Sequence, residues 1–97
     1  MKKTISIIGS TGSIGLSTLK IIDKKKNLFS IDLLSAHKNY ASIVSQIIKY
    51  NPKVFVISNN KIFEKIKKKF KNKKKIHILN NFNEIKLKRK TDITVSA

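Results

Sequence analysis

The chain has 97 residues, a length that suits one small domain and excludes two. It is 40% hydrophobic, which indicates a folded protein, and it contains no cysteine, which excludes disulfides, thiolate metal sites and a cysteine nucleophile. No apolar run is long enough for a transmembrane helix, so no membrane partner is expected. The apolar stretch after Met1 breaks at Gly9 without a cleavage pattern, so we expect a cytoplasmic protein.

The charge of +17 comes from 22 basic and 5 acidic residues. This excess is compatible with a nucleic-acid partner. However, Arg89 is the only arginine, and arginine supplies the bidentate contacts typical of nucleic-acid recognition. Lysine, isoleucine and asparagine are frequent together, as A+T-rich codons would produce. Specific nucleic-acid binding is therefore not expected, and a basic nucleic-acid-binding protein stays an alternative.

The first predicted elements are a strand over 4–8 and a helix over 13–26. The strand is a short β-branched apolar run, typical of a buried position. The helix has Ser13 as its expected N-cap and lysines at its end, where cations favour the helix dipole. We expect its inward face to carry Ile14, Leu16, Leu19, Ile21 and Ile22.

A second strand is predicted over 31–36, and a second helix runs from residue 40 to Asn51-Pro52, where the proline ends it. The apolar residues of this helix follow an i, i+3, i+4, i+7, i+8 pattern, so they lie on one face. They are Tyr40, Ile43, Val44, Ile47 and Ile48.

The next elements are a strand over 54–58, a helix over 60–71 and a short strand over 76–79. The helix turns Ile62, Phe63, Ile66 and Phe70 inward, and the lysines between 65 and 75 form its solvated outer face and its exit. A weak helical turn over 82–87 and a strand over 93–97, in which the chain stops, complete the pattern.

Strands that alternate with helices predict βαβ units with right-handed crossovers. The expected fold is α/β, a Rossmann-like three-layer fold with a mainly parallel sheet, truncated in a late strand. There is no internal repeat and no flexible linker, so residues 1–97 form one domain.

All three glycines lie between the first strand and the first helix, in GSTGSIG over residues 9–15. Such a turn typically binds phosphate, because glycines let the backbone approach an anion and the N–H groups of the helix start point toward it. No lysine follows the last glycine, which excludes a P-loop. The spacing G-x-x-G-x-x-G is one residue longer than the dinucleotide fingerprint G-x-G-x-x-G, with Ser10 in the place of its first glycine.

Each glycine has an expected role in this turn. Gly9 turns the chain away from the strand, Gly12 admits a pyrophosphate, and Gly15 lets the helix lie close to the sheet. The context of a strand before and a helix after favours dinucleotide binding over a turn that only joins two elements.

The end of the second strand carries Ser-Ala-His-Lys-Asn over residues 35–39 and no acid. An Asp or Glu here would bind the ribose 2′-hydroxyl of NAD, whereas a cation accommodates the 2′-phosphate of NADP. Lys38 therefore favours NADP(H), and His37 is assigned to the adenosine end of the cofactor. The nearest carboxylate, Asp32, lies upstream within the strand.

The five acidic residues are scattered, so neither a divalent-metal cluster nor a carboxylate acid–base pair is predicted. His77 lies in a predicted strand and is interpreted as a packed or edge histidine rather than a base. The residues thus predict a cofactor-binding unit without catalytic residues. Another Rossmann dehydrogenase, such as an aspartate-semialdehyde or extended short-chain type, stays an alternative.

GSTGSIG, followed by LSTLKII and by LLSAHKN, resembles the N-terminus of the 1-deoxy-D-xylulose 5-phosphate reductoisomerase family, and the closing DITVSA is similar too. The resemblance covers essentially the whole chain. It implies an NADPH-binding domain followed by a catalytic domain with Mg²⁺ or Mn²⁺. It also implies a homodimeric enzyme that converts 1-deoxy-D-xylulose 5-phosphate to 2-C-methyl-D-erythritol 4-phosphate in non-mevalonate isoprenoid synthesis.

The resemblance assigns cofactor contacts to seven positions. Those toward the pyrophosphate and the adjacent cofactor are Thr11, Gly12, Ser13 and Ile14. Lys38 and Asn39 take the 2′-phosphate end, and His37 replaces a glycine common in the family, so it either crowds or helps to hold the adenine ribose. The family's metal-binding acids and substrate-phosphate residues lie beyond position 97. The chain is therefore expected to be an incomplete N-terminal domain, inactive alone, with the catalytic and C-terminal domains absent.

Overall fold

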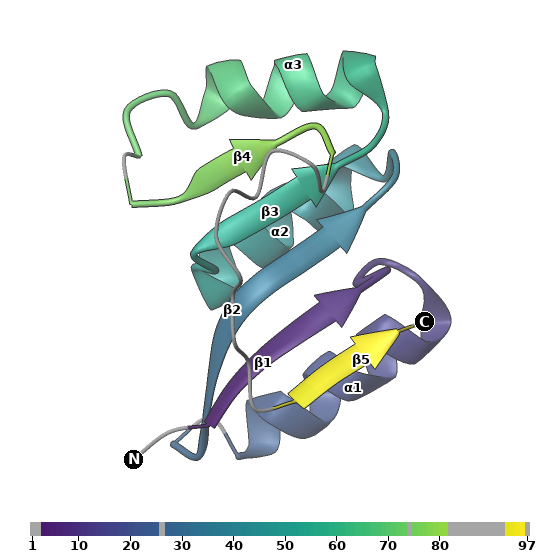
Figure 1. The fold of residues 1–97 in the computed structure, drawn as a ribbon, viewed down its shortest axis with the longest axis vertical. Helices are drawn as coiled ribbons and strands as arrows, with labels where there is room; N and C mark the ends of the chain where they lie inside the picture. Colours follow the sequence, from purple (N-terminus) through teal and green to yellow (C-terminus); the bar gives the residue numbers. More distant parts are fainter. Residues whose placement is uncertain (1–2, 26, 74, 82–92, 97) are drawn as a thin grey trace.

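The computed structural model describes residues 3–25, 27–73, 75–81 and 93–96. Five strands form one sheet in the order β4-β3-β2-β1-β5, and every neighbouring pair is parallel. The strands are β1 (Lys3–Ile8), β2 (Phe29–Ala36), β3 (Val54–Ile57), β4 (His77–Leu79) and β5 (Ile93–Ser96). The expected α/β fold with a parallel sheet is confirmed (Figure 1).

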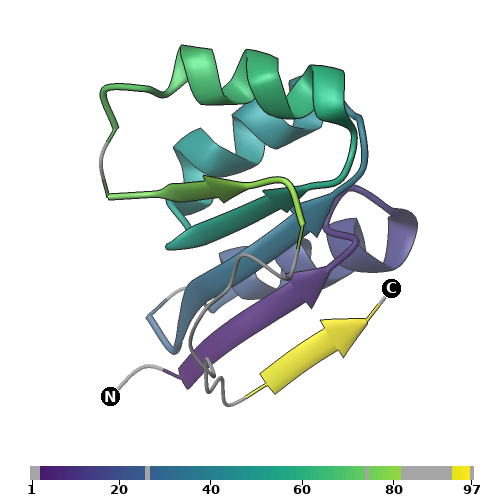
Figure 2. The ribbon, with the colours of Figure 1, turned by 45° about the horizontal axis from the view of Figure 1, so that its top comes forward.

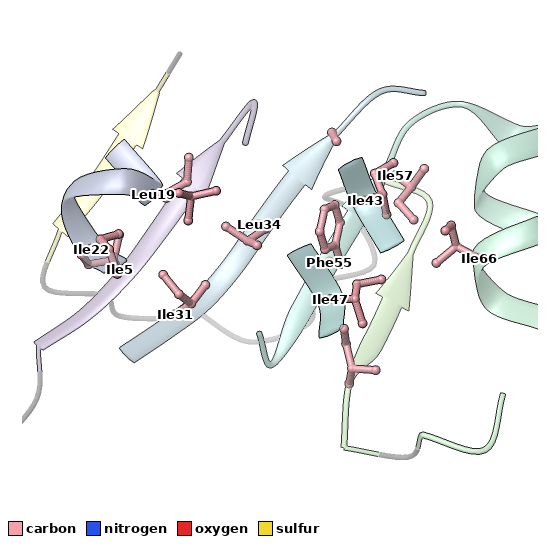
Figure 3. Close-up of a cluster of buried hydrophobic side chains, with 13 residues drawn as sticks. Ile5, Leu19, Ile22, Ile31, Leu34, Ile43, Ile47, Phe55, Ile57 and Ile66 are labelled. Carbon is pink, nitrogen blue, oxygen red and sulfur yellow. The ribbon is translucent and has the colours of Figure 1, made fainter. Parts of the chain in front are cut away.

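Three helices connect the first four strands: α1 (Ser13–Lys24), α2 (Tyr40–Tyr50) and α3 (Asn60–Lys69). Each starts where it was predicted. Right-handed crossovers that advance in one direction along a sheet place their helices on the same face. Accordingly, all three contribute to one buried cluster with that face, as Figure 3 shows for Leu19, Ile43 and Ile66. The helical turn predicted over 82–87 lies outside the described residues.

An irregularity in β2 sets which side chains face the helices. The pairing with β1 shifts so that Ile5 lies opposite Ile31 and Ser6 opposite Leu33, which leaves Asp32 as an extra residue. Ile31 and Leu34 consequently both join the helix-side cluster despite their odd spacing. Leu33 belongs to a smaller cluster with Val54 and Val56.

The inward face of α1 is narrower than predicted. Leu19 and Ile22 are buried as expected, but Ile14, Leu16 and Ile21 are 57%, 41% and 60% exposed, so their assignment to the inward face was wrong. The physical reason is Gly15, whose close contact with the preceding loop directs the line of residues 15, 19 and 22 toward the sheet.

In α2 and α3 the predicted faces are largely confirmed. Ile43, Ile47 and Ile66 are fully buried, and Val44, Ile62, Phe63 and Phe70 pack against the same cluster. Tyr40 and Ile48, at the edge of the predicted stripe, are exposed instead, and Gln46 is buried. Helix α2 ends at Tyr50, and its C-cap Asn51 adopts a left-handed conformation with φ 50° directly before Pro52. Within the described ranges, no helix combines the length and the apolar character needed to cross a membrane.

Candidate functional site

The loop of residues 9–12, called the glycine loop below, follows β1 at the point where the strand order reverses. Strands β2, β3 and β4 lie on one side of β1, and β5 lies on the other. Figure 2 shows the arrowheads of β1 and β5 pointing to the same edge, where the chain turns into α1. Open α/β sheets bind ligands outside the carboxyl ends of their strands at such a reversal. The topology therefore places the glycine loop at the expected ligand edge.

Two glycines are required by the backbone geometry of this loop and of the helix that packs on it. Gly9 has a φ of 84°, which side chains rarely allow. A Cβ at Gly15 would meet the carbonyl oxygen of Gly9 and lie 2.7 Å from the Cα of Ser10. The expected roles of Gly9 in the turn and of Gly15 in close packing are confirmed.

The start of α1 has no side-chain cap. Its N-cap is Gly12, and its first turn carries no acidic residue. The prediction of Ser13 as the N-cap was wrong, because Gly12 already has the extended conformation of a cap and Ser13 is the first helical residue. Since no side chain of the helix start accepts from its first-turn N–H groups, they suit an external anion.

Helices α2 and α3 differ from α1 in this respect. The Asn39 side chain accepts a hydrogen bond from the Ser42 amide at 3.2 Å, and the Asn59 side chain accepts one from the Ile62 amide at 3.1 Å. Both asparagines therefore cap their own helices. Of the three described helices, α1 alone begins without such an acceptor.

Two residues that were not predicted from the sequence, Ser35 and Gln46, hold the glycine loop through hydrogen bonds. The Ser35 carbonyl accepts from the Gly9 and Ser10 amides at 3.0 and 2.8 Å. Ser10 donates its hydroxyl to Gln46 Oε1 at 2.6 Å, and Gln46 Nε2 donates to the Ser10 carbonyl at 2.9 Å. A signal was present: Gln46 is a polar residue on the same helical face as the buried Ile43 and Ile47.

The second part of the candidate site is the turn after β2, which continues directly into α2. His37 Nδ1 lies 2.6 Å from Ser58 Oγ, and the Asn59 amide donates to the His37 carbonyl at 3.1 Å. Lys38 is exposed. The capping role of Asn39 was not predicted. Because Ser35 binds the glycine loop just before this turn, both parts lie at the same edge of the sheet.

The other candidate residues lie as follows. Thr11 is half-buried, whereas Gly12, Ser13 and Ile14 are exposed at the loop and the first turn of α1. Asp32 is buried within β2 and so does not lie at the strand end. His77 is exposed at the start of β4, the outer strand of the sheet, which confirms its interpretation as an edge residue. Across the described ranges, no three potential metal ligands gather in one place.

Comparison with known proteins points to one family. The profile of the 1-deoxy-D-xylulose 5-phosphate reductoisomerase family matches residues 5–97. The reductoisomerase of Pelagibacter ubique is 40% identical over 83 residues, which cover 86% of this chain and 21% of that protein. The enzyme of Wigglesworthia glossinidia brevipalpis is 41% identical over 100 residues, covering 98% of this chain and 25% of that protein. The chain thus spans about a fifth to a quarter of the length of these relatives.

Solved structures of the same family share the fold. A reductoisomerase in complex with magnesium superposes with a TM-score of 0.76 at 23% identity, covering 88% of this chain and 21% of that one. The reductoisomerase from Zymomonas mobilis in complex with NADPH gives 0.73 at 24% identity, covering 81% of this chain and 21% of that one. With its sequence and its fold both matched, the chain belongs to the 1-deoxy-D-xylulose 5-phosphate reductoisomerase family.

Proposed function

We propose that the chain binds NADPH at the carboxyl edge of its sheet, as the N-terminal NADPH-binding domain of a 1-deoxy-D-xylulose 5-phosphate reductoisomerase. The observation that carries the proposal is the uncapped start of α1 at the strand reversal. A related structure, that from Zymomonas mobilis, is a complex with NADPH.

The pyrophosphate is assigned to the glycine loop and the first turn of α1. Gly12 leaves space, because a Cβ there would meet only the Gly9 carbonyl oxygen, at 3.5 Å. The contacts are assigned to Thr11, Gly12, Ser13 and Ile14. The Gly12 amide already donates to the Gly9 carbonyl at 3.1 Å, so Gly12 contributes close approach of its backbone rather than a donor. The exposed Ile14 side chain offers an apolar surface beside the phosphates, which suits an adjacent ring of the cofactor.

The 2′-phosphate is assigned to the turn after β2. Lys38 is exposed at the strand end, where a cation accommodates this phosphate. Asn39 uses its Oδ1 as a helix cap, so the contact proposed for it uses the amide nitrogen or the backbone. His37 is held by Ser58 beside them and is assigned to the adenine ribose.

The activity of the complete enzyme is also a proposal for this chain. NADPH supplies a hydride when bound, and the substrate would be a phosphorylated sugar, 1-deoxy-D-xylulose 5-phosphate. No divalent metal is assigned to this chain, because its described residues offer no cluster of three ligands. We further propose a homodimeric, cytoplasmic enzyme in which residues 1–97 supply the cofactor and other segments supply the catalytic groups.

Titration with NADPH and NADH tests the cofactor proposal. Because the chain carries a net charge of +17, any polyanion will associate with it to some degree, so affinity alone decides nothing. We expect NADPH to bind at least tenfold more tightly than both NADH and ATP, measured by calorimetry at 0.15 M salt. ATP is the matched control because it carries comparable charge without the 2′-phosphate. Equal affinities for the three ligands would overturn the proposal.

A further inference from the structure

Ser10 stands where the usual fingerprint has its first glycine, and it is fully buried. Its hydroxyl lies 2.6 Å from Gln46 Oε1 and 3.3 Å from the Ser35 carbonyl oxygen. Its carbonyl oxygen accepts from Gln46 Nε2 at 2.9 Å. Ser10 therefore anchors the loop to α2, which provides its hydrogen-bond partner Gln46.

Both polar groups of the Gln46 side-chain amide bind Ser10. Gln46 is only 4% exposed, and it belongs to the buried face of α2 together with Ile43 and Ile47. In the described part of the chain, no buried side-chain nitrogen or oxygen lacks a hydrogen-bond partner. An amide placed in an apolar face is unfavourable unless both its groups are satisfied. The pairing of Gln46 with Ser10 meets this condition completely.

A shift in the position of Ser10 would also move the backbone groups that are assigned to the pyrophosphate. Gly15 packs so closely on the Gly9–Ser10 backbone that it admits no Cβ, and the Gly12 amide donates to the Gly9 carbonyl at 3.1 Å. The start of α1 and the N-cap residue are therefore both positioned by the backbone that Gln46 holds.

We propose that Gln46 is a positioning residue for the pyrophosphate, acting through Ser10. The inference rests on the proposed NADPH site. The pyrophosphate is common to NADPH and NADH, so loss of this support weakens both cofactors by the same factor. A change in the 2′-phosphate contacts would instead alter the ratio of the two affinities.

The test compares Gln46→Leu with Ile47→Val in the same helix. Ile47 is fully buried but belongs to the apolar cluster, so its variant reports loss of packing alone. We expect Gln46→Leu to weaken the binding of NADPH and of NADH about tenfold each, so that the ratio of the two affinities is unchanged. Ile47→Val should leave both affinities as in the wild type. Wild-type affinities in a folded Gln46→Leu protein would overturn the inference.

Two further measurements keep the test decisive. Ser10→Ala is a milder change that removes only the hydroxyl contact. It should weaken the binding of both cofactors less than Gln46→Leu does. Combining the two variants should weaken cofactor binding by less than the product of the single effects, because the hydroxyl and the amide act as one unit.

Backbone amide NMR shifts over residues 9–14 should change in Gln46→Leu and not in Ile47→Val, even without cofactor. Unchanged shifts would contradict the positioning role, whereas a wild type that binds neither cofactor would contradict the proposed function instead.

Discussion

The imidazole of His37 and the hydroxyl of Ser58 bridge the carboxyl ends of β2 and β3, with Nδ1 and Oγ 2.6 Å apart. The backbone supports this contact, because the Ser58 amide donates to the Ala36 carbonyl at 3.2 Å. A ring held in place loses less conformational freedom when it contacts a ligand. The contact therefore favours a His37 that helps to hold the adenine ribose over one that crowds it.

We expect His37→Ala to weaken NADPH binding several-fold and Ser58→Ala to cause part of this loss. Ser58→Thr, which keeps the hydroxyl, should restore the affinity. Calorimetric titration of the wild type, these three variants and His37→Gly measures the effect. Tighter binding by His37→Gly than by the wild type would show that the ring crowds the ribose.

Lys38→Ala should weaken the binding of NADPH by about 1–2 kcal/mol, roughly tenfold in affinity, because a charge-assisted hydrogen bond is lost. NADH should be almost unaffected, since it has no 2′-phosphate. The matched control is Lys61→Ala, which removes an equal charge from an exposed position of α3. Equal losses in both variants would mean that only the overall charge attracts NADPH.

The three glycines should separate folding from binding. Gly9→Ala and Gly15→Ala should each lower the free energy of unfolding by about 1–3 kcal/mol, the first through its positive φ and the second through overpacking against backbone atoms. The gain in helix propensity at position 15, about 1 kcal/mol, offsets only part of that cost. Urea unfolding followed by circular dichroism measures these changes.

Gly12→Ala should have the opposite profile. Its φ of −79° suits any residue, and the nearest atom to an added Cβ is at ordinary contact distance. We therefore expect nearly wild-type stability together with weaker binding of both cofactors, because the methyl group enters the space assigned to the pyrophosphate. A stable variant with unchanged affinities would contradict that assignment.

Stability at high pH should depend on Tyr50. Burial, followed by its hydrogen bond with Asp23, raises the pKa of the Tyr50 phenol above its ordinary value of 10.0. A group whose folded-state pKa is raised contributes stability below its unfolded-state pKa and loses it as pH rises through the folded-state value. The neighbouring Lys49, paired with Asp23 at 2.9 Å, has a raised pKa as well, mainly through that hydrogen bond.

We therefore expect the free energy of unfolding of the wild type to fall, relative to that of Tyr50→Phe, as pH rises above about 10. Denaturant unfolding at pH 8 and at pH 11 measures this difference. The two proteins should respond to pH in parallel below pH 9. A constant difference across the whole range would show that folding does not shift the pKa of the phenol.

Nucleic acid provides a further check on the charge. We expect weak binding to random-sequence duplex DNA with a steep dependence on salt, because lysines exchange for condensed counterions without base contacts. Fluorescence anisotropy at several salt concentrations measures the slope. A sequence-specific site of nanomolar affinity at physiological salt would support a nucleic-acid function instead.

The elements and their parallel arrangement follow from the sequence, because apolar periodicity and the positions of Gly9 and Pro52 determine them locally. The rotation of α1 does not follow. The pattern of apolar residues does not distinguish Ile14 from Leu19. The contact of Gly15 with the loop backbone decides which of the two is buried.

The sequence identified the positions that are assigned to the cofactor, but not the residues that support the glycine loop. Residues 11–14 and 37–39 belong to recognisable segments, but Ser35 and Gln46 act through hydrogen bonds to a loop distant in the sequence. The capping by Asn39 is a local pattern that the sequence contained, since an asparagine before a helix is a frequent cap.

The extra residue in β2 has a consequence for how the protein tolerates deletions. Alternation would place residues 31, 33 and 35 on one face, but the shift at Asp32 puts Ile31 and Leu34 together on the helix side. The hydroxyl of Ser35 that accepts from the Gly9 amide at 3.1 Å lies beyond this shift. Loss of residue 32 would therefore restore regular pairing, with Leu33 still opposite Ser6 and Leu34 still opposite Ile7, and would leave the side chains that reach the ligand edge on their present faces.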